Sequence, residues 1–106
     1  MAADHLTGLG MRVLARNWRC RWGELDIVAA DSDGRTLVFV EVKARSTTEF
    51  GGVEEAVTPQ KLRRLRRLAA LWLAENNQRW PNLRIDVIGV RFGGRYPELL
   101  HLTGIG

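Results

Sequence analysis

The sequence predicts an α/β domain with a mixed central sheet that contains a hairpin and is flanked by helices. Two β-rich runs at residues 23–31 and 36–44 are separated by the turn-forming letters DSDG. A helical pattern follows at 58–76, and a further strand pattern follows that helix at 83–92. Strands on either side of one long helix, in a chain of 106 residues, favour a right-handed parallel crossover within a single sheet.

The other expected elements are shorter. Residues 2–9 predict the end of a helix that stops at Gly10, and residues 11–20 alternate as in a short strand. The polar run STTEFGG at 46–52 predicts a loop, and ELLHL at 98–102 predicts a last short strand. We expect all of these elements to form one domain.

The long helix is expected to begin with Thr58 as its N-cap and Pro59 in its first position, and to end near Asn76. Apolar residues recur at spacings of three and four and predict a stripe that faces a core: Leu62, Leu65, Leu68, Ala69 and Trp72. The positions between them predict a basic outer surface: Lys61, Arg63, Arg64, Arg66 and Arg67.

Composition limits the compartment and the partners. The single cysteine, Cys20, cannot form an internal disulfide, which favours a cytoplasmic protein. No apolar run approaches the roughly 18 residues of a membrane span, and the N-terminus lacks a signal-peptide pattern, so we expect a soluble protein without membrane contact. A net charge of +4 and a pI near 10.2 favour polyanionic partners.

The hairpin places four charged residues on strands that are otherwise apolar. A two-residue turn at Asp33-Gly34, or a four-residue loop from 32 to 35, puts Asp26 opposite Glu41 and Glu24 opposite Lys43. In this register one face is predicted to carry only apolar residues: Leu25, Ile27, Ala29, Val38, Val40 and Val42. The other face is predicted to begin apolar and to become charged at the end far from the turn: Val28, Ala30, Leu37 and Phe39, then the four charges.

Two interpretations of these charges stay open at this point. Facing carboxylates repel unless a cation lies between them, and Mg²⁺ suits two carboxylates with water and a backbone carbonyl. Alternatively, Glu24 pairs with Lys43, while Asp26 and Glu41 pair with arginines elsewhere on an exposed strand end. The acids lie where the neighbouring valines indicate burial, and an unpaired buried charge costs several kcal/mol.

Asp26 followed by Glu41-Val42-Lys43 resembles the acid and acid-x-lysine pattern of the PD-(D/E)xK superfamily of metal-dependent nucleases. Longer segments are similar to the YraN-type family of uncharacterised small proteins, a branch related to Holliday-junction resolvases: NWRCRWGELDIVAAD, LVFVEVKAR, AVTPQKLRRLRRLAALWL and RIDVIGV. The resemblance implies a restriction-endonuclease-like core and cleavage of DNA phosphodiesters with Mg²⁺ or Mn²⁺, with branched DNA as a candidate substrate. It also makes a homodimer plausible.

The resemblance also implies roles for individual residues. Asp26 and Glu41 would be metal ligands, and the carbonyl of Val42 would complete the site. Lys43 would orient the attacking water or stabilise charge on the phosphorane, and Glu24 would lie just outside the ligands or serve a second metal. Family members start with a longer helix that carries a G-x-x-G-E-x-x-A segment, and this chain starts without that glutamate, so we expect a truncated first helix.

Basic residues near these acids and on the helix are candidates for binding the phosphates of DNA: Arg19, Arg21, Arg45, Lys61, Arg63, Arg64 and Arg67. A solvated helix face explains the helical ones equally well. Trp18 and Trp22 could stack on bases or pack against the sheet. His5 and His101 are expected to be structural, and so is Asp86, although its place on a neighbouring strand leaves open a role beside the metal ligands. Two other functions remain as alternatives: a non-catalytic nucleic-acid-binding module, and a protein-interaction domain.

Overall fold

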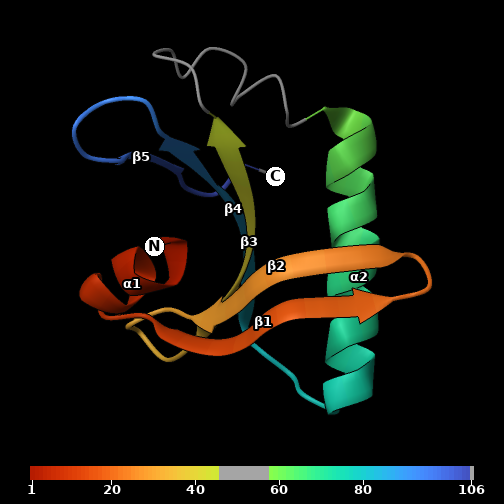
Figure 1. Cartoon of the computed structure of the whole chain (residues 1–106). Helices are drawn as coiled ribbons and strands as arrows, with labels where there is room; N and C mark the ends of the chain where they lie inside the picture. The colour runs from red at the N-terminus through yellow and green to blue at the C-terminus, as the bar shows by residue number, and fades with distance from the viewer. Residues whose placement is uncertain (46–57, 106) are drawn as a thin grey trace.

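A five-stranded mixed sheet with one helix on each face forms the fold (Figure 1). The computed structural model describes residues 1–45 and 58–105, with Arg45 described by its backbone alone. In chain order the elements are α1 (Ala2–Gly8), β1 (Arg12–Cys20), β2 (Gly23–Ala30), β3 (Thr36–Arg45), α2 (Pro59–Asn76), β4 (Asn82–Arg91) and β5 (Glu98–Leu102). The mixed α/β prediction is therefore confirmed, and the architecture is compatible with a restriction-endonuclease-like core. The loop expected at 46–52 lies outside the described residues.

The strands lie in the order β1-β2-β3-β4-β5. β3 and β4 are parallel, from Thr36 opposite Asn82 to Arg45 opposite Arg91, and every other neighbouring pair is antiparallel. The parallel pair is the crossover that the sequence predicts, because α2 lies between β3 and β4 in the chain. In residues 1–45 and 58–105, no helix is long and apolar enough to cross a membrane.

The sequence allowed a two-residue turn or a four-residue loop between β2 and β3. The structure has the four-residue loop, at residues 32–35. Asp31 and Thr36 close it, with the N–H of Asp31 donating to the carbonyl of Thr36 at 2.9 Å. Gly34 takes a φ of 70°, which favours glycine. The carboxylate of Asp33 accepts the N–H of Arg35 at 2.8 Å and the hydroxyl of Thr36 at 2.9 Å. These bonds, the backbone bond from Arg35 first, lower the pKa of Asp33.

Local signals define α2 at both ends. The hydroxyl of Thr58 accepts the N–H of Lys61 at 3.2 Å, and Pro59 follows as the first helical residue. At the other end Asn77 takes a left-handed φ of 51°, which stops the helix after Asn76. The predicted stripe faces the sheet, with Leu65, Leu68, Ala69 and Trp72 buried and Leu62 partly buried.

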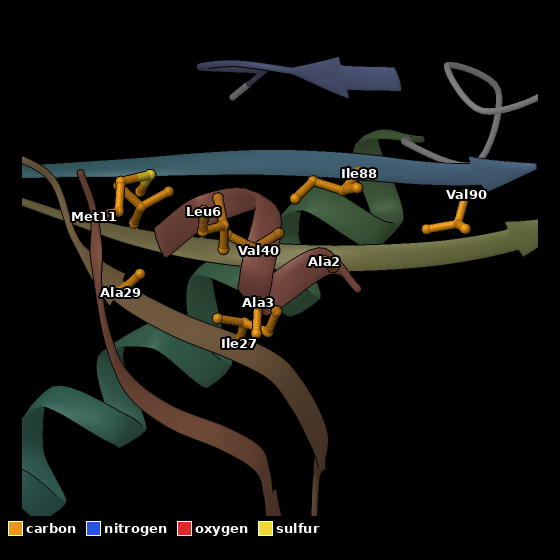
Figure 2. Packing of buried hydrophobic residues seen from close by; sticks show 10 residues of the cluster. Ala2, Ala3, Leu6, Met11, Ile27, Ala29, Val40, Ile88 and Val90 are labelled. Atoms are coloured by element: carbon orange, nitrogen blue, oxygen red, sulfur yellow. The ribbon is translucent and has the colours of Figure 1, made fainter. Parts of the chain in front are cut away.

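Each helix covers its own apolar cluster. On the α1 face, Figure 2 shows Leu6 and Ala3 of α1 among Ile27, Val40 and Ile88 from three neighbouring strands. On the α2 face, the cluster includes Val28, Leu37, Phe39, Leu65, Leu68 and Trp72. The two clusters account for the alternation along β2 and β3 that the hairpin register predicts.

Leu25 is an exception to the predicted faces. It was expected beside Ile27, but it is buried in the α2 cluster. The β1–β2 ladder keeps its register here, from Arg16 opposite Ile27 to Trp18 opposite Leu25, but Asn17 between Arg16 and Trp18 has a left-handed φ of 52°, so β1 is distorted at this point. Figure 1 shows the β1–β2 hairpin crossing α2, and Leu25 packs in one cluster with Leu65 and Leu68 of that helix.

Candidate active site

The site begins where β2 and β3 separate. Their ladder keeps the predicted register but ends with Ile27 opposite Val40. One residue further, the carboxylate of Asp26 accepts the N–H of Val42 at 2.7 Å, in place of a backbone partner on β2. A side chain therefore satisfies the backbone N–H of β3 at this point. Beyond it, the end of the hairpin opens into a cavity.

Glu41 lies on β3 at this opening and is buried, with 8% of its surface exposed. Its Oε1 is 3.6 Å from Nζ of Lys43 and 3.6 Å from Nη2 of Arg64. Its Oε2 is buried and has no hydrogen-bond partner among the described residues. Leaving such an atom unsatisfied costs about 1–3 kcal/mol or more for a charged group, so the pocket favours a cation or donor here.

The environment of Asp26 also favours an added cation. Burial raises the pKa of Asp26, and the nearby carboxylates of Glu41 and Glu24 raise it further. The N–H of Val42 and the ammonium of Lys43 act in the opposite direction without cancelling the shift. The ionised form is therefore disfavoured at this position relative to water, and a bound cation would relieve it.

Glu24 departs from the predicted pairing. It was expected opposite Lys43, but it lies opposite Arg19 on β1, and its Oε2 is 3.1 Å from Nε of Arg19. The reason is that β2 leaves β3 beyond Ile27 and continues to pair with β1. Glu24 still borders the site, in a cavity of about 300 Å³ lined by Gly23, Glu24, Asp26, Glu41, Val42, Lys43, Arg64 and Leu65.

The donor set fits Mg²⁺ or Mn²⁺ in part. In the part of the chain that the structure describes, no group of three or more His, Cys, Asp and Glu side chains is placed to hold a metal ion. Asp26 and Glu41 nevertheless offer two carboxylates, one with an unpartnered buried oxygen, and Val42 lines the same cavity. Mg²⁺ is commonly held by one or two carboxylates together with water and substrate phosphate. A metal here would therefore depend on those further oxygens.

Four of the predicted phosphate-binding residues lie around Trp22. Arg63, Arg64 and Arg67 border a second cavity of about 200 Å³ that Trp22 and Leu68 complete. Arg21 lies in the adjacent β1–β2 turn, with its guanidinium carbon 5.0 Å from the centre of the Trp22 ring. Arg19 is held by Glu24, and Lys61 is half-buried at the start of α2. The side chain of Arg45 lies outside the described part of the structure.

Arg64 was predicted to bind phosphate, and its approach to Glu41 was not predicted. The sequence did offer one indication that Arg64 lies near the sheet. Arg64 is four residues before the buried Leu68, and residues at this spacing lie on one side of a helix. Arg16, which lies near the four charges in the sequence as Arg19 and Arg21 do, lines a cavity of about 240 Å³ on the α1 side of the sheet together with Asn17 and Asp26. Asp26 therefore borders two cavities.

Trp18 and Trp22, for which stacking and packing were both open, differ in the structure. Trp18 packs against the α2 cluster, and its indole N–H donates to Glu75 at 2.9 Å. Trp22 stays 49% exposed.

Asp86 and the two histidines form a separate network, as expected for structural residues. Asp86 is fully buried and accepts from Arg84, from the N–H of Gly104 and, at 2.8 Å, from Nε2 of His101. Nδ1 of His101 lies 3.1 Å from Nε2 of His5. The network joins α1, β4 and β5.

The family model described as "Uncharacterised protein family UPF0102" matches residues 1–90. A UPF0102 protein of Mycolicibacterium gilvum is 64% identical over 107 residues, covering 100% of this chain and 87% of the relative. A UPF0102 protein of Mycobacterium tuberculosis is 60% identical over 110 residues, covering 100% of this chain and 86% of the relative. A solved structure of Pyrococcus furiosus SfsA in complex with Ca²⁺ has a TM-score of 0.38 and 18% identity, covering 99% of this chain and 59% of that one. The YraN-type resemblance is confirmed, and the chain belongs to the uncharacterised protein family UPF0102.

Proposed function

We propose that this chain is a metal-dependent DNA endonuclease that hydrolyses phosphodiester bonds, with branched DNA as a candidate substrate. The observation that carries the proposal is the pair of carboxylates where β2 and β3 separate. Asp26 has a raised pKa, and Glu41 has a buried oxygen that meets no hydrogen-bond partner in residues 1–45 and 58–105, so both acids favour an added cation. Lys43 and Arg64 beside them could bind an anionic phosphate.

Asp26 and Glu41 would hold Mg²⁺ or Mn²⁺, with the carbonyl of Val42 as a further ligand. When bound, the ion would lower the pKa of a coordinated water and neutralise charge on the phosphoryl oxygens. The N–H of Val42 orients the Asp26 carboxylate through their 2.7 Å bond. This bond ties Asp26 on β2 to β3, the strand that carries Glu41, and so holds the two acids in place.

Lys43 and Arg64 would act on the phosphate. Each lies 3.6 Å from Oε1 of Glu41, a distance that leaves both cations short of a hydrogen bond. A scissile phosphate in the cavity could therefore recruit both without breaking a tight ion pair. Lys43 would orient the attacking water or stabilise the charge that develops on the phosphorus oxygens. Arg63, Arg67 and Arg21 would bind phosphates further along the strand.

The test is cleavage of a panel of single-stranded, duplex, flap and four-way-junction DNA with Mg²⁺ or Mn²⁺. We expect at least one substrate to be cut, and Glu41→Gln and Asp26→Asn each to lower the rate by about 100-fold or more, because each removes a ligand charge. Glu98→Gln, which removes an exposed acid from β5, is the matched control and should cut normally. Cleavage that survives Asp26→Asn and Lys43→Ala together would contradict the assigned mechanism.

A non-catalytic nucleic-acid-binding module is the second candidate, and one observation favours it. Lys43 and Arg64 both approach Glu41, so two cations already offset part of its charge without a metal. This candidate predicts DNA binding that weakens steeply with salt, and no cleavage of any substrate with either metal. The same panel, run beside a binding titration, separates the two candidates.

A further inference from the structure

The turn between β1 and β2 presents an exposed tryptophan against α2. Arg21 and Trp22 are the two residues between these strands. The next residue, Gly23, has a φ of 142°, a conformation that favours glycine, and it lies next to Leu68 of α2. The guanidinium carbon of Arg67 on the same helix lies 4.2 Å from the centre of the Trp22 ring.

The charged residues that line the cavity beside Trp22 are all arginines. Its cavity of about 200 Å³ is lined by Trp22, Arg63, Arg64, Arg67 and Leu68. Arg64 also lines the cavity that holds Asp26 and Glu41. A ligand that extends from one cavity into the other would therefore place an anionic group beside the carboxylate site and a flat group on the indole ring.

We propose that Trp22 is a stacking platform for an unpaired nucleobase, and that Arg63, Arg64 and Arg67 bind the phosphates that flank this base. This inference rests on the proposed binding of nucleic acid and narrows the substrate class to strands with unpaired nucleotides next to the carboxylate site. Aromatic rings and guanidinium groups are the side chains that stack on bases. A base within a duplex is covered on both faces by its neighbours, so only an unpaired or terminal base can reach the ring.

Other occupants fit the surface less well. A second copy of this chain would bring the same arginines against each other, which like-charge repulsion disfavours. An acidic polypeptide would satisfy the arginines, but it offers no flat base for the exposed indole of Trp22. A nucleic acid strand supplies both the phosphates and the stacking surface.

The experiment measures binding by fluorescence anisotropy in a chelator, so that hydrolysis plays no part. The probes are a single strand, a blunt duplex and a duplex with an overhang, matched in the number of phosphates, together with polyglutamate as a purely acidic polymer. The variants are Trp22→Ala and Trp22→Phe. Tyr96→Ala is the matched control, because Tyr96 is 70% exposed and also lies beneath a guanidinium, that of Arg95 at 5.7 Å. Its loop, between β4 and β5, lies across the molecule from the β1–β2 turn (Figure 1).

We expect Trp22→Ala to weaken binding of the single strand and the overhang about tenfold, and binding of the blunt duplex less than about twofold. Trp22→Phe should keep most of the affinity, and Tyr96→Ala should match the wild type. Thermal unfolding of Trp22→Ala should also match the wild type, because the residue is exposed.

An equal loss on all three oligonucleotides, or an equal loss on polyglutamate, would overturn the stacking platform and show recognition of charge alone. That result would leave the proposed nuclease standing if the wild type cuts DNA. Conversely, selective loss on unpaired strands without any cleavage would support the platform and overturn the endonuclease. A wild-type chain that binds none of the oligonucleotides would overturn both.

Discussion

Two clusters of carboxylates lie in this sheet, one around the buried Asp86 and one around the half-buried Asp26 and the buried Glu41. The oxygens of Asp86 receive Nε and Nη2 of Arg84 at 3.0 and 3.1 Å, Gly104 N–H at 3.0 Å and His101 Nε2 at 2.8 Å. In the other cluster, Asp26 accepts the N–H of Val42 at 2.7 Å, whereas Oε1 of Glu41 has only two cations at 3.6 Å. Oε2 of Glu41 has no partner among the described residues. Glu41 is buried as Asp86 is, but only the second cluster has capacity left for a ligand.

This difference distinguishes a structural acid from a candidate ligand. Asp86 joins three elements through bonds that are complete without any added group. Asp26 and Glu41 repel each other, and the pKa of Asp26 is raised as a result of burial and of that repulsion. A protein that only needed stability at the Glu41 position would place an apolar residue there, as it does at Leu37 and Phe39 on the same strand. The retained acids are thus better explained by a ligand.

The largest effect on stability is expected for the Asp86 cluster, in which both carboxylate oxygens have hydrogen-bond partners. Asp86→Ala is expected to lower the free energy of unfolding by about 3 kcal/mol, because it leaves Arg84 and His101 without their buried partner. Urea unfolding followed by circular dichroism measures this change. Asp4→Ala removes an almost fully exposed aspartate and should leave the midpoint nearly unchanged. A small effect of Asp86→Ala would show that the network contributes little, and the contrast between the clusters would fail.

The second prediction tests whether the cluster of Asp26 and Glu41 binds a metal ion. Mg²⁺ or Mn²⁺ at about ten times its dissociation constant should raise the free energy of unfolding by about 1.4 kcal/mol, because the ion binds only the folded site. Glu41→Gln should abolish this increase, whereas Glu98→Gln should retain it. Urea unfolding at rising metal concentration provides the measurement. The absence of any response in the wild type would count against the metal site.

The third prediction is a substitution that raises the free energy of unfolding, whereas Asp86→Ala lowers it. Asp26→Asn should stabilise the metal-free protein at neutral pH by up to about 1 kcal/mol, because asparagine can still accept the N–H of Val42 but carries no charge. A raised pKa means that the wild type loses stability as pH rises from the ordinary 3.8 through the folded-state pKa. The two proteins should therefore have equal stability below pH 3.8 and differ fully above the folded-state pKa. Destabilisation by Asp26→Asn at neutral pH would contradict this account.

Much of the fold could be predicted because its signals are local. The DSDG turn defines the hairpin register, and Thr58-Pro59 starts α2 where expected. The register in turn brings Asp26 and Glu41 to the same end of the hairpin. This step needs only the two-residue period of strands, and it is why the acids could be placed together from the sequence. Their roles as metal ligands came from the resemblance to the PD-(D/E)xK pattern.

Long-range packing explains the features that could not be predicted. Leu25 turns to α2 because β2 follows β1 away from β3, which depends on how the hairpin lies on the helix. The approach of Arg64 to Glu41 depends on where α2 crosses the sheet. His5 and His101 meet across 96 positions of the chain, a distance over which spacing carries no information. Such contacts arise only once the elements pack.

The smallest effect should come from Asp33, which sharpens the comparison with Asp26. Both are aspartates of the β2–β3 hairpin, but the N–H of Arg35 and the hydroxyl of Thr36 lower the pKa of Asp33 instead of raising it. A lowered pKa gives stability that is present above the ordinary 3.8 and is lost as pH falls through the folded-state pKa. Asp33→Asn should therefore lower the thermal midpoint slightly at pH 7, whereas Asp26→Asn raises it.

Thermal unfolding at pH 7 and at a pH below the folded-state pKa of Asp33 tests this contrast. The Asp33→Asn deficit should disappear at the lower pH, because the wild-type carboxylate is then protonated in the folded state as well. If both variants shifted the midpoint in the same direction at pH 7, the loss of an aspartate charge would have one general effect on this hairpin. The distinction between a satisfied and an unsatisfied carboxylate would then not explain stability, and the case for a ligand at Asp26 would rest on metal binding alone.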